Sequence, residues 1–579
     1  MSMAYDVIVV GSGGAGLLAA LRAADLGLNV IVVEKSHRYG GTSATSGGAL
    51  WIPNHGLEGH IDSDEQAMTY LVAVTQGADQ KRLRAYVENG RQMVSYLSDV
   101  GIRFEVVPGL PDYFSNAPGA VAGRALFPAE IDGSSLGNDY FTMRELPYAF
   151  KLFNRYSLDL AQSFALSARP FGWRWVAAKM FMKYWLDIPW RMKTRRDRRA
   201  TMGVALVAGL RRELNRRGVQ VLLNTGLEHL DVAGGRVVGV RLSSSRQLSY
   251  LRAGRAVILA AGGFEQNQAM RDRCMTVPTN ANWSLTPPGA NAGDAIRAGE
   301  AIGAATEFME CAWWAPSMQL PARHIPNVDV THQMFFDHRH PNSVCVNRLG
   351  FRFVNESGSY DRFGIAMIDD HRKTGANVPC WMIFDATYRA KYTCGGIMPA
   401  SVMPDRRIPP DWWDNYLYRA DTIGGLAEKV GIDEARLTTV ISEMNGYAAT
   451  GVDLQFGRGG EAYDRYFGDA RVSPNPCMGP INQPPYYAIR IDLGDLGTKG
   501  GLKADEHARV LNRHGDPIPG LYAAGNSSGS AFGNCYPGAG GTLGPALTFA
   551  YLAANDIAGR ATAAPRCRER AAQYPTQRV

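Results

Sequence analysis

Residues 5–36 alternate apolar runs with one glycine-rich turn. The order is "YDVIVV", "GSGGAG", "LLAALRAADLGLNV" and "IVVEKS", which predicts a strand, a tight turn, an amphipathic helix and a second strand. Gly11, Gly13 and Gly16 satisfy the spacing GxGxxG. In this setting glycine allows the turn and lets a pyrophosphate approach the backbone at the N-terminus of the helix. These residues therefore predict a βαβ unit that binds a dinucleotide.

Two features select the dinucleotide. Glu34 ends the second predicted strand, where an acid would hold ribose hydroxyls, and no arginine stands in its place to accept a 2′-phosphate, which leaves NAD or FAD. The next segment, "GGTSATSGGALWIPN" (Gly40–Asn54), offers small residues against which a flat ring system could lie, and it favours FAD. The residues that we expect to contact FAD lie after predicted strands or before the last predicted helix: Gly11, Gly13, Gly14, Ala15, Gly16, Glu34, Lys35, Gly41, Thr42, Ser43, Ser46, Gly47, Gly48, Ala261, Gly262, Gly525, Asn526, Gly541, Thr542 and Leu543.

Two later apolar runs indicate that the nucleotide-binding domain is split in sequence. "AVILAAGGF" (Ala256–Phe264) and "GLYAAGN" (Gly520–Asn526) each read as a buried strand that ends in glycine. We therefore predict an α/β fold with a Rossmann-like FAD-binding domain. Its parts are residues 1–305 and 484–579, with an α+β catalytic (cap) domain at 306–483 and a tryptophan-rich, basic helical insertion at 150–200.

Composition excludes several classes of protein. Lys+Arg 61 against Asp+Glu 54 gives a net charge of +7, too weak for 579 residues to indicate a nucleic-acid partner. The eight cysteines never form CxxC, so we expect reduced thiols in a cytoplasmic protein and no metal site. We expect no export signal and no membrane-spanning helix. "DHRH" at 337–340 is interpreted as a surface loop rather than a metal site.

A lone tyrosine stands in the loop "GNCYPGAGGTLGPALTF" (Gly533–Phe549). Pro545 suits the first position of the helix that is predicted to follow. A helix N-terminus directed at a bound flavin would stabilise negative charge on the pyrimidine side of the reduced ring. The loop with Tyr536 would then lie beside the flavin, where substrate binds.

Five motifs in order resemble those of the FAD-dependent 3-ketosteroid dehydrogenases, within the fumarate reductase and succinate dehydrogenase flavoprotein superfamily. They are "GSGGAG", "GGTSATSGGALWIPN", "NESGSYDRFG", "GDLGTKGGL" and "YPGAGGTLGPA", and the resemblance covers nearly the whole chain. It implies Δ1-dehydrogenation of 3-keto-4-ene steroids in steroid or sterol degradation. A hydride would leave ring-A carbon 1 for flavin N5, and a proton would leave carbon 2 for a tyrosine.

The resemblance also implies roles for individual residues. The Tyr536 hydroxyl and the Gly540 N–H would donate hydrogen bonds to the 3-keto oxygen, and Tyr360 would abstract the proton. Since a phenol with a pKa of about 10 is a poor base, Tyr360 needs a lowered pKa or a partner, for which Tyr113 is the candidate. No histidine lies between Gly40 and Trp51, where covalent relatives attach their flavin, so FAD should be bound non-covalently.

Other functions stay open at this stage. A 3-ketosteroid Δ4-(5α)-dehydrogenase would share much of the flavin scaffold, and a fumarate-type reductase would need arginine and histidine side chains for a dicarboxylate. A third alternative is an electron-transfer subunit whose substrate chemistry lies in a partner. "YPGAGGT" favours the Δ1-dehydrogenase because tyrosine and glycine suit a single ketone.

The segment Pro170–Ala200 has two open interpretations. One predicted helical face carries apolar residues, and a basic run with the single acid Asp197 follows it. The segment would bind the inner face of the cytoplasmic membrane peripherally, close to sterols and to a quinone electron acceptor, or it would bury this face on the protein itself or on a second subunit. The apolar residues are Trp173, Val176, Ala177, Met180 and Tyr184, and the basic ones Arg191, Lys193, Arg195, Arg196, Arg198 and Arg199.

Overall fold

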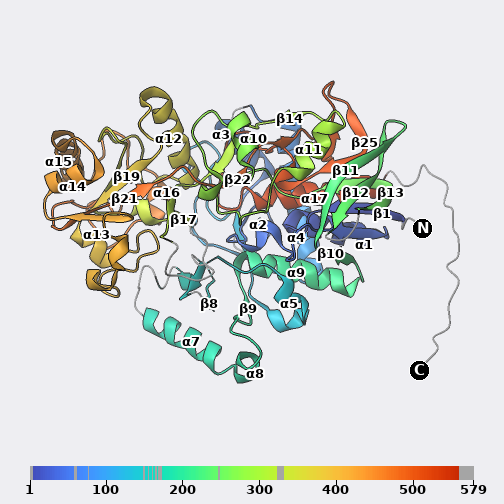
Figure 1. The fold of residues 1–579 in the computed structure, drawn as a ribbon, viewed down its shortest axis with the longest axis horizontal. Helices are drawn as coiled ribbons and strands as arrows, with labels where there is room; N and C mark the ends of the chain where they lie inside the picture. Colours follow the sequence, from blue (N-terminus) through green and yellow to red (C-terminus); the bar gives the residue numbers. More distant parts are fainter. Residues whose placement is uncertain are drawn as a thin grey trace.

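The protein is a mixed α/β molecule, seen in a computed structural model (Figure 1). The structure describes residues 4–559 with the exception of 58–60, 76, 148–149, 154, 160, 164–165, 167–171, 245–247 and 322–330. Parts of the predicted segments 150–200 and 484–579, Cys567 included, therefore lie outside the described residues. No disulfide and no cluster of metal-ligating side chains occurs among the residues described.

A sheet built from both ends of the chain forms the nucleotide-binding part. Val7 to Val10 of β1 (Ala4–Val10) pair in parallel with β2 (Val30–Val33) on one side and with the end of β13 (Leu248–Leu259) on the other. β10 (Gln220–Leu222) extends the sheet beyond β2, and β25 (Pro517–Ala523) pairs with β13. The continuous apolar runs fit parallel strands that are covered on both faces. The predicted α/β class with a Rossmann-like unit is confirmed, and the two later strands join its sheet.

The first half of β13 belongs to an antiparallel part of the same sheet. It pairs in antiparallel fashion with β12 (Arg236–Ser244), which pairs with β11 (Thr225–Ala233). One long strand thus links a parallel sheet to an antiparallel meander.

Three helices pack together on one side of the parallel sheet. α1 (Gly14–Asp25) lies between α9 (Met202–Arg216) and α17 (Leu543–Gly559), and α4 (Gln80–Asp99) packs on α17. α17 begins at Leu543, so Pro545 is its third residue rather than its first, a position that still lies in the first turn, where the missing N–H costs no helical bond.

The second part of the molecule lies at the left of Figure 1. Its antiparallel sheet has the order β18 (Ser343–Val346), β19 (Cys380–Phe384), β21 (Tyr486–Ile491) and β20 (Leu417–Ala420). β21 lies beyond residue 483, so this sheet draws on the segment predicted to belong to the FAD-binding domain. Helix α12 (Tyr360–Thr374) packs on β15 (Ala312–Trp314). β15 pairs in antiparallel fashion with β22 (Asp495–Thr498), and this pair joins the two parts of the molecule.

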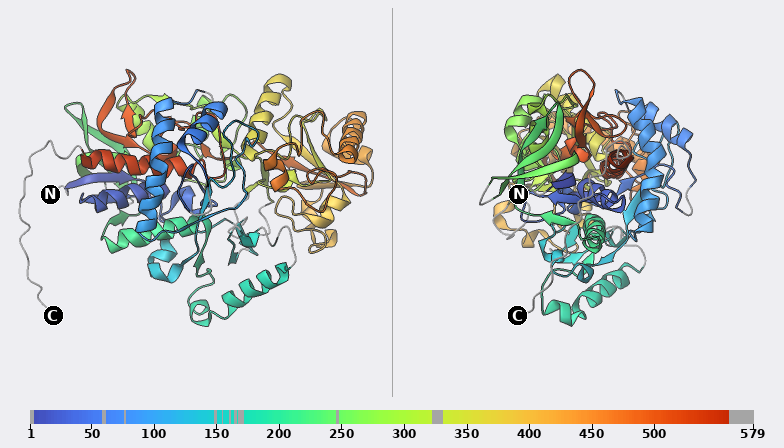
Figure 2. Two further views of the ribbon diagram at one scale, coloured as in Figure 1. Left: turned by 180° about the vertical axis from the view of Figure 1, so that it is seen from behind. Right: turned by 90° about the vertical axis from the view of Figure 1, so that its right-hand side faces the viewer.

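Helices α7 (Trp173–Trp185) and α8 (Ile188–Arg191) stand apart from both sheets, as all the views in Figures 1 and 2 show. Met180 and Tyr184 are buried in a small cluster with Tyr156 and Leu158. The face that was predicted to bind a membrane is therefore directed inward, because hairpin β7–β8 (Lys151–Leu152 and Tyr156–Ser157) supplies the partner Tyr156, which helical periodicity does not reveal. Among the described residues, no helix has the length and apolar character needed to cross a membrane.

Candidate active site

Three tyrosines from distant parts of the chain meet where the two parts of the molecule join. The hydroxyls of Tyr113 and Tyr360 are 2.9 Å apart and share a hydrogen bond. The ring of Tyr536 lies 5.3 Å from that of Tyr113 and 5.7 Å from that of Tyr360, measured between centroids. All three side chains are buried. The residues singled out from three separate motifs therefore form one cluster.

Backbone contacts hold the loops of this cluster together. The Tyr113 N–H donates to the carbonyl oxygen of Pro537, at 3.1 Å. The hydroxyl of Tyr70 donates to the same oxygen, at 2.6 Å. Tyr360 is the first residue of α12, whose N-terminus is capped by the side chain of Ser359. Hydrogen bonds therefore hold the backbone at or next to each of the three tyrosines.

A buried arginine supports the cluster from behind. Arg339 donates a 2.9 Å hydrogen bond to the hydroxyl of Tyr463, whose ring lies 4.9 Å from that of Tyr113. Arg339 belongs to the run "DHRH", whose interpretation as a surface loop is wrong: Asp337, His338 and Arg339 are all buried. The charged residues of this run suggested that it is exposed to solvent. Arg339 is instead covered by aromatic rings from a distant part of the chain, Tyr463 and Phe467. No sequence signal would have identified Tyr463.

Burial raises the pKa of all three tyrosines. For Tyr360 and Tyr113 the pKa lies well above 10, since burial disfavours the phenolate and the nearby Tyr536 adds to the effect at both residues, although the hydrogen bond with Tyr360 opposes it at Tyr113. Burial also raises the pKa of Tyr536, although a hydrogen bond with Thr542 opposes it. A lowered pKa is therefore not what would make Tyr360 a base. The shared hydrogen bond with Tyr113 supplies the partner that the chemistry needs, since either hydroxyl can donate or accept.

The candidate donors for a ketone lie on one short loop. Thr542 donates a 3.1 Å hydrogen bond to the Tyr536 oxygen, so the proton of Tyr536 can be donated elsewhere. Gly540 has φ +99°, and a Cβ there would lie 2.5 Å from the backbone of Leu50 and of Trp51. Packing against this segment thus requires glycine, in addition to any approach by substrate. The Gly540 N–H forms no hydrogen bond within the described part of the chain.

The glycines of the first turn divide by role. A Cβ on Gly11 would lie 2.3 Å from the carbonyl oxygen of Ala260, and one on Gly16 would lie 2.0 Å from that of Gly11, so both are required by packing. A Cβ on Gly13 would meet no protein atom closer than 3.5 Å. The space beside Gly13 is therefore left for something other than protein.

The N-terminus of α1 is free to bind an anion. The Gly14 N–H donates to the Ser43 hydroxyl at 2.9 Å, whereas the N–H groups of Ala15 and Gly16 have no acceptor among the described residues. Unpaired N–H groups at a helix N-terminus attract phosphate. Together with the space at Gly13, they fit the pyrophosphate of FAD.

The other predicted cofactor segments converge on the same point. A Cβ on Gly41 would lie 3.3 Å from the Gly13 Cα, and one on Gly525 would lie 3.5 Å from the Ala15 Cβ. The Ser527 hydroxyl joins the Ala261 N–H to the Gly262 carbonyl. The other residues of the predicted cofactor set contact protein groups. Asn291 donates to Thr42, Ser46 accepts the Gly48 N–H, and Gly47 lies near Phe127. Gly541 packs on the Tyr536 ring, and Leu543 is the first residue of α17.

Two charged residues of the predicted set already have protein partners. The Glu34 carboxylate accepts hydrogen bonds from both the N–H and the hydroxyl of Ser12, and from the Ser36 N–H. Lys35 forms a 2.7 Å ion pair with Asp294. Glu34 keeps acceptor capacity for ribose hydroxyls, while Lys35 serves mainly to tie the second strand to α11 (Asp294–Ala301).

A small cavity of about 20 Å³ lies beside three of the predicted cofactor residues, Gly525, Asn526 and Thr542. Its lining includes Asn526 and Thr542 from the predicted cofactor set, together with Trp313, whose ring stands 5.0 Å from that of Tyr536. Two buried cations, Arg82 and Lys499, also line it, and neither was singled out from the sequence. The two predicted sites are thus adjacent.

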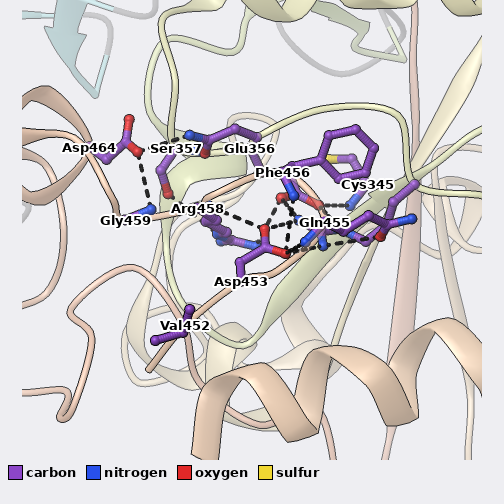
Figure 3. A network of polar contacts seen from close by, with 12 residues as sticks. Cys345, Glu356, Ser357, Val452, Asp453, Gln455, Phe456, Arg458, Gly459 and Asp464 are labelled. Carbon is purple, nitrogen blue, oxygen red and sulfur yellow. Dashed lines mark hydrogen bonds and ion pairs between the residues drawn. The ribbon is translucent and has the colours of Figure 1, made fainter. Parts of the chain in front are cut away.

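Four buried charges fix the segment that precedes Tyr360, and three of them, Glu356, Asp453 and Arg458, are labelled in Figure 3. Arg352 forms 2.8 Å hydrogen bonds with both Glu356 and Asp453, and Arg458 lies 3.6 Å from Glu356. Burial would raise the pKa of Asp453, but its contacts with Arg352 outweigh this and lower the pKa to about 2. Since all four side chains are fully buried, this loop is held by paired charges that are costly to separate.

Comparison with known proteins gives consistent matches. The family described as "FAD binding domain" matches residues 6–543. The chain is 39% identical to a 3-oxosteroid 1-dehydrogenase of Mycolicibacterium smegmatis, over 96% of this chain and 98% of that protein. It is 36% identical to a 4-oxocyclohexanecarboxylate 2-dehydrogenase of Sinomonas cyclohexanicum, over 96% and 93%. The crystal structure of a 3-ketosteroid delta1-dehydrogenase from Sterolibacterium denitrificans in complex with 1,4-androstadiene-3,17-dione has a TM-score of 0.92 and 45% identity, over 96% of this chain and 100% of that one.

Proposed function

The chain belongs to the FAD binding domain family, and we propose that it is an FAD-dependent dehydrogenase that introduces the 1,2 double bond into 3-ketosteroids. The observation that carries this proposal is the Tyr113–Tyr360 hydrogen bond of 2.9 Å beside Tyr536. Three phenols in one buried cluster suit an uncharged ketone. A dicarboxylate would instead call for cations directed at its two ends.

The chain's own residues would carry the proton chemistry. Tyr536 and the Gly540 N–H would donate to the 3-keto oxygen and stabilise the charge that develops there as carbon 2 loses its proton. Tyr360 would receive that proton, with Tyr113 sharing it through the hydrogen bond between them. FAD, when bound, supplies the acceptor for the hydride from carbon 1, so that the C1–H and C2–H bonds break and one C=C bond forms.

The substrate class is tested by anaerobic mixing of the yellow holoenzyme with candidate ketones. A 3-keto-4-ene steroid should bleach the flavin faster than a 5α-saturated 3-ketosteroid or 4-oxocyclohexanecarboxylate does. Fastest bleaching by the 5α-saturated steroid would instead favour the Δ4-(5α)-dehydrogenase. Reduced enzyme that is reoxidised by fumarate, with no reduction by any ketone, would favour a fumarate-type reductase.

We also propose that α7 and α8 bind an anionic membrane surface peripherally. Trp175, Met182 and Leu186 lie on one outward face of this helical segment and are 79%, 54% and 69% exposed. Ile188 and Met192 continue the exposed apolar surface. A neighbouring hollow of about 450 Å³ is lined by Lys179, Lys183 and Arg198 next to Met182 and Leu186. Asp187 also lines it and pairs with Arg198, which leaves the two lysines to attract phosphate head groups above acyl chains.

This surface would bring the protein close to its substrate and to its electron acceptor. Sterols with long side chains partition into membranes, and a membrane quinone would reoxidise the flavin without a soluble carrier. The proposed location is the inner face of the cytoplasmic membrane. The bound face is the outward one of Trp175 and Leu186, not the inward one of Met180 and Tyr184.

A further inference from the structure

We propose that Lys499 is a positioning residue that sets the separation of Tyr360 and Tyr536. The inference rests on the proposed function, because it concerns the two tyrosines of that reaction. Lys499 lies in the motif "GDLGTKGGL", directly after β22, and its side chain is fully buried. A buried ammonium is costly unless every proton finds an acceptor. The acceptors of Lys499 are what give it this role.

The ammonium of Lys499 joins the two segments that carry the tyrosines. It donates to both carboxylate oxygens of Asp361, at 3.0 and 3.1 Å, and to the carbonyl oxygen of Asn534, at 2.8 Å. Asp361 follows Tyr360 directly in the first turn of α12, and Asn534 precedes Tyr536 by two residues. One charged group therefore fixes the start of α12 against the ketone-binding loop.

Two further contacts restrain the ammonium of Lys499 and its partner, the Asp361 carboxylate. The ammonium lies 5.1 Å from the centroid of Trp313, whose ring stands edge-on to Tyr536 at 5.0 Å. The Asp361 carboxylate also accepts the Trp314 N–H at 3.1 Å. Lys499 thus acts on Tyr536 through the loop backbone and through the Trp313 ring, and on Tyr360 through Asp361.

The stability of two variants shows what the Lys499–Asp361 ion pair contributes to folding alone. A buried pair can often be neutralised as a unit with little loss of stability, whereas removal of one partner leaves an unpaired charge. Lys499→Met alone should therefore destabilise the protein. Lys499→Met combined with Asp361→Asn should regain most of that stability, because the amide still accepts the Trp314 N–H. The tie to Asn534 is lost in both variants.

The test compares stability with chemistry in the Lys499→Met/Asp361→Asn double variant. The rate of flavin reduction at saturating steroid and the rate of carbon 2 hydrogen exchange should each fall about 100-fold, the effect of misplacing a catalytic group by about 1 Å. Adding Lys499→Met to Tyr360→Phe should lower the rate by a smaller factor than it does in the wild-type background, because groups coupled in one network are not additive. Wild-type rates in the double variant, or fully additive losses, would overturn the proposal.

A matched control comes from a second buried ion pair, which joins Asp495 of β22 to Arg271 of helix α10 (Gln268–Cys274). Arg271 and Asp495 are fully buried and 2.7 Å apart, and their other hydrogen bonds include those to Glu265 and Ser284. Arg271→Met should lower the melting temperature as Lys499→Met does, but it should leave the saturated rate within about 2-fold of wild type. A rate loss equal to that of Lys499→Met would reduce Lys499 to general stabilisation.

A crystal structure separates this inference from the proposed function. The Tyr360 and Tyr536 rings stand 5.7 Å apart in the wild type. The double variant should show them displaced relative to each other, whether or not any steroid is turned over. An unchanged separation contradicts the role of Lys499 even if steroid activity is found. A wild-type enzyme inert toward every ketone contradicts the proposed function alone.

Discussion

The Tyr113 and Tyr360 hydroxyls share a 2.9 Å hydrogen bond although the residues are 247 positions apart in sequence. Tyr113 comes from a loop of the FAD-binding part, whereas Tyr360 begins a helix of the other part. The proposed base thus depends on correct docking of the two parts. Any change that separates them should slow proton removal before it unfolds either one.

The hydroxyl of Tyr536 is proposed to donate to the ketone. Tyr536→Phe should lower the saturated rate of flavin reduction by about 100-fold or more, the usual effect of losing one oxyanion donor. FAD content should stay at the wild-type level. Tyr416→Phe is the matched control, because it removes another buried hydroxyl whose partner, the Gly395 carbonyl, lies away from the cluster. Equal activity of the two variants would reject the ketone-binding role.

The rate of proton removal should rise with pH. Burial raises the pKa of Tyr360 well above 10, so the phenolate fraction increases about tenfold per unit across the neutral and alkaline range. Anaerobic flavin reduction at saturating steroid should therefore rise from pH 7 to pH 10 without a plateau, and Tyr360→Phe should abolish the dependence. A plateau below pH 8 would mean that a group of lower pKa is the base.

The glycines of the first turn should respond differently to alanine. Gly13→Ala should leave the apoprotein as stable as wild type, since its Cβ would meet no protein atom within 3.5 Å, but it should weaken FAD binding. Gly11→Ala should instead destabilise the apoprotein, because its Cβ would lie 2.3 Å from the Ala260 oxygen. Thermal unfolding of the apoproteins and FAD titration measure the two effects. Full FAD affinity in Gly13→Ala would contradict the pyrophosphate role.

The outward face of α7 and α8 should determine membrane binding. Changing Trp175, Met182 and Leu186 together to Ser should abolish co-sedimentation with anionic liposomes, whereas the same change at Val402 and Leu454, exposed elsewhere, should not. Equal recovery of wild type and the triple variant in the supernatant would reject the membrane role.

The parts of the fold that follow from local pattern were predictable. The βαβ unit, the strands around Ala256 and Gly520, and the family resemblance required only apolar runs, glycine spacing and motifs. The residues that sequence reasoning missed are defined by long-range packing: Arg339 is buried by Tyr463, more than a hundred positions away, and Lys499 by Asp361. The inward direction of Met180 has the same origin, since its partner Tyr156 lies on a hairpin with no clear sequence signal. The predicted domain boundaries and the roles of the site residues stay predictions.

The position of the new double bond tests the central claim most directly. Holoenzyme is mixed anaerobically with one equivalent of a 3-keto-4-ene steroid that is fully deuterated at carbons 1 and 2, and the product is analysed by mass spectrometry and NMR. We predict one equivalent of the 1,4-dien-3-one per flavin reduced, with one deuterium lost from each of the two carbons. A flavin that stays oxidised, or a product unsaturated at any other position, would contradict the account.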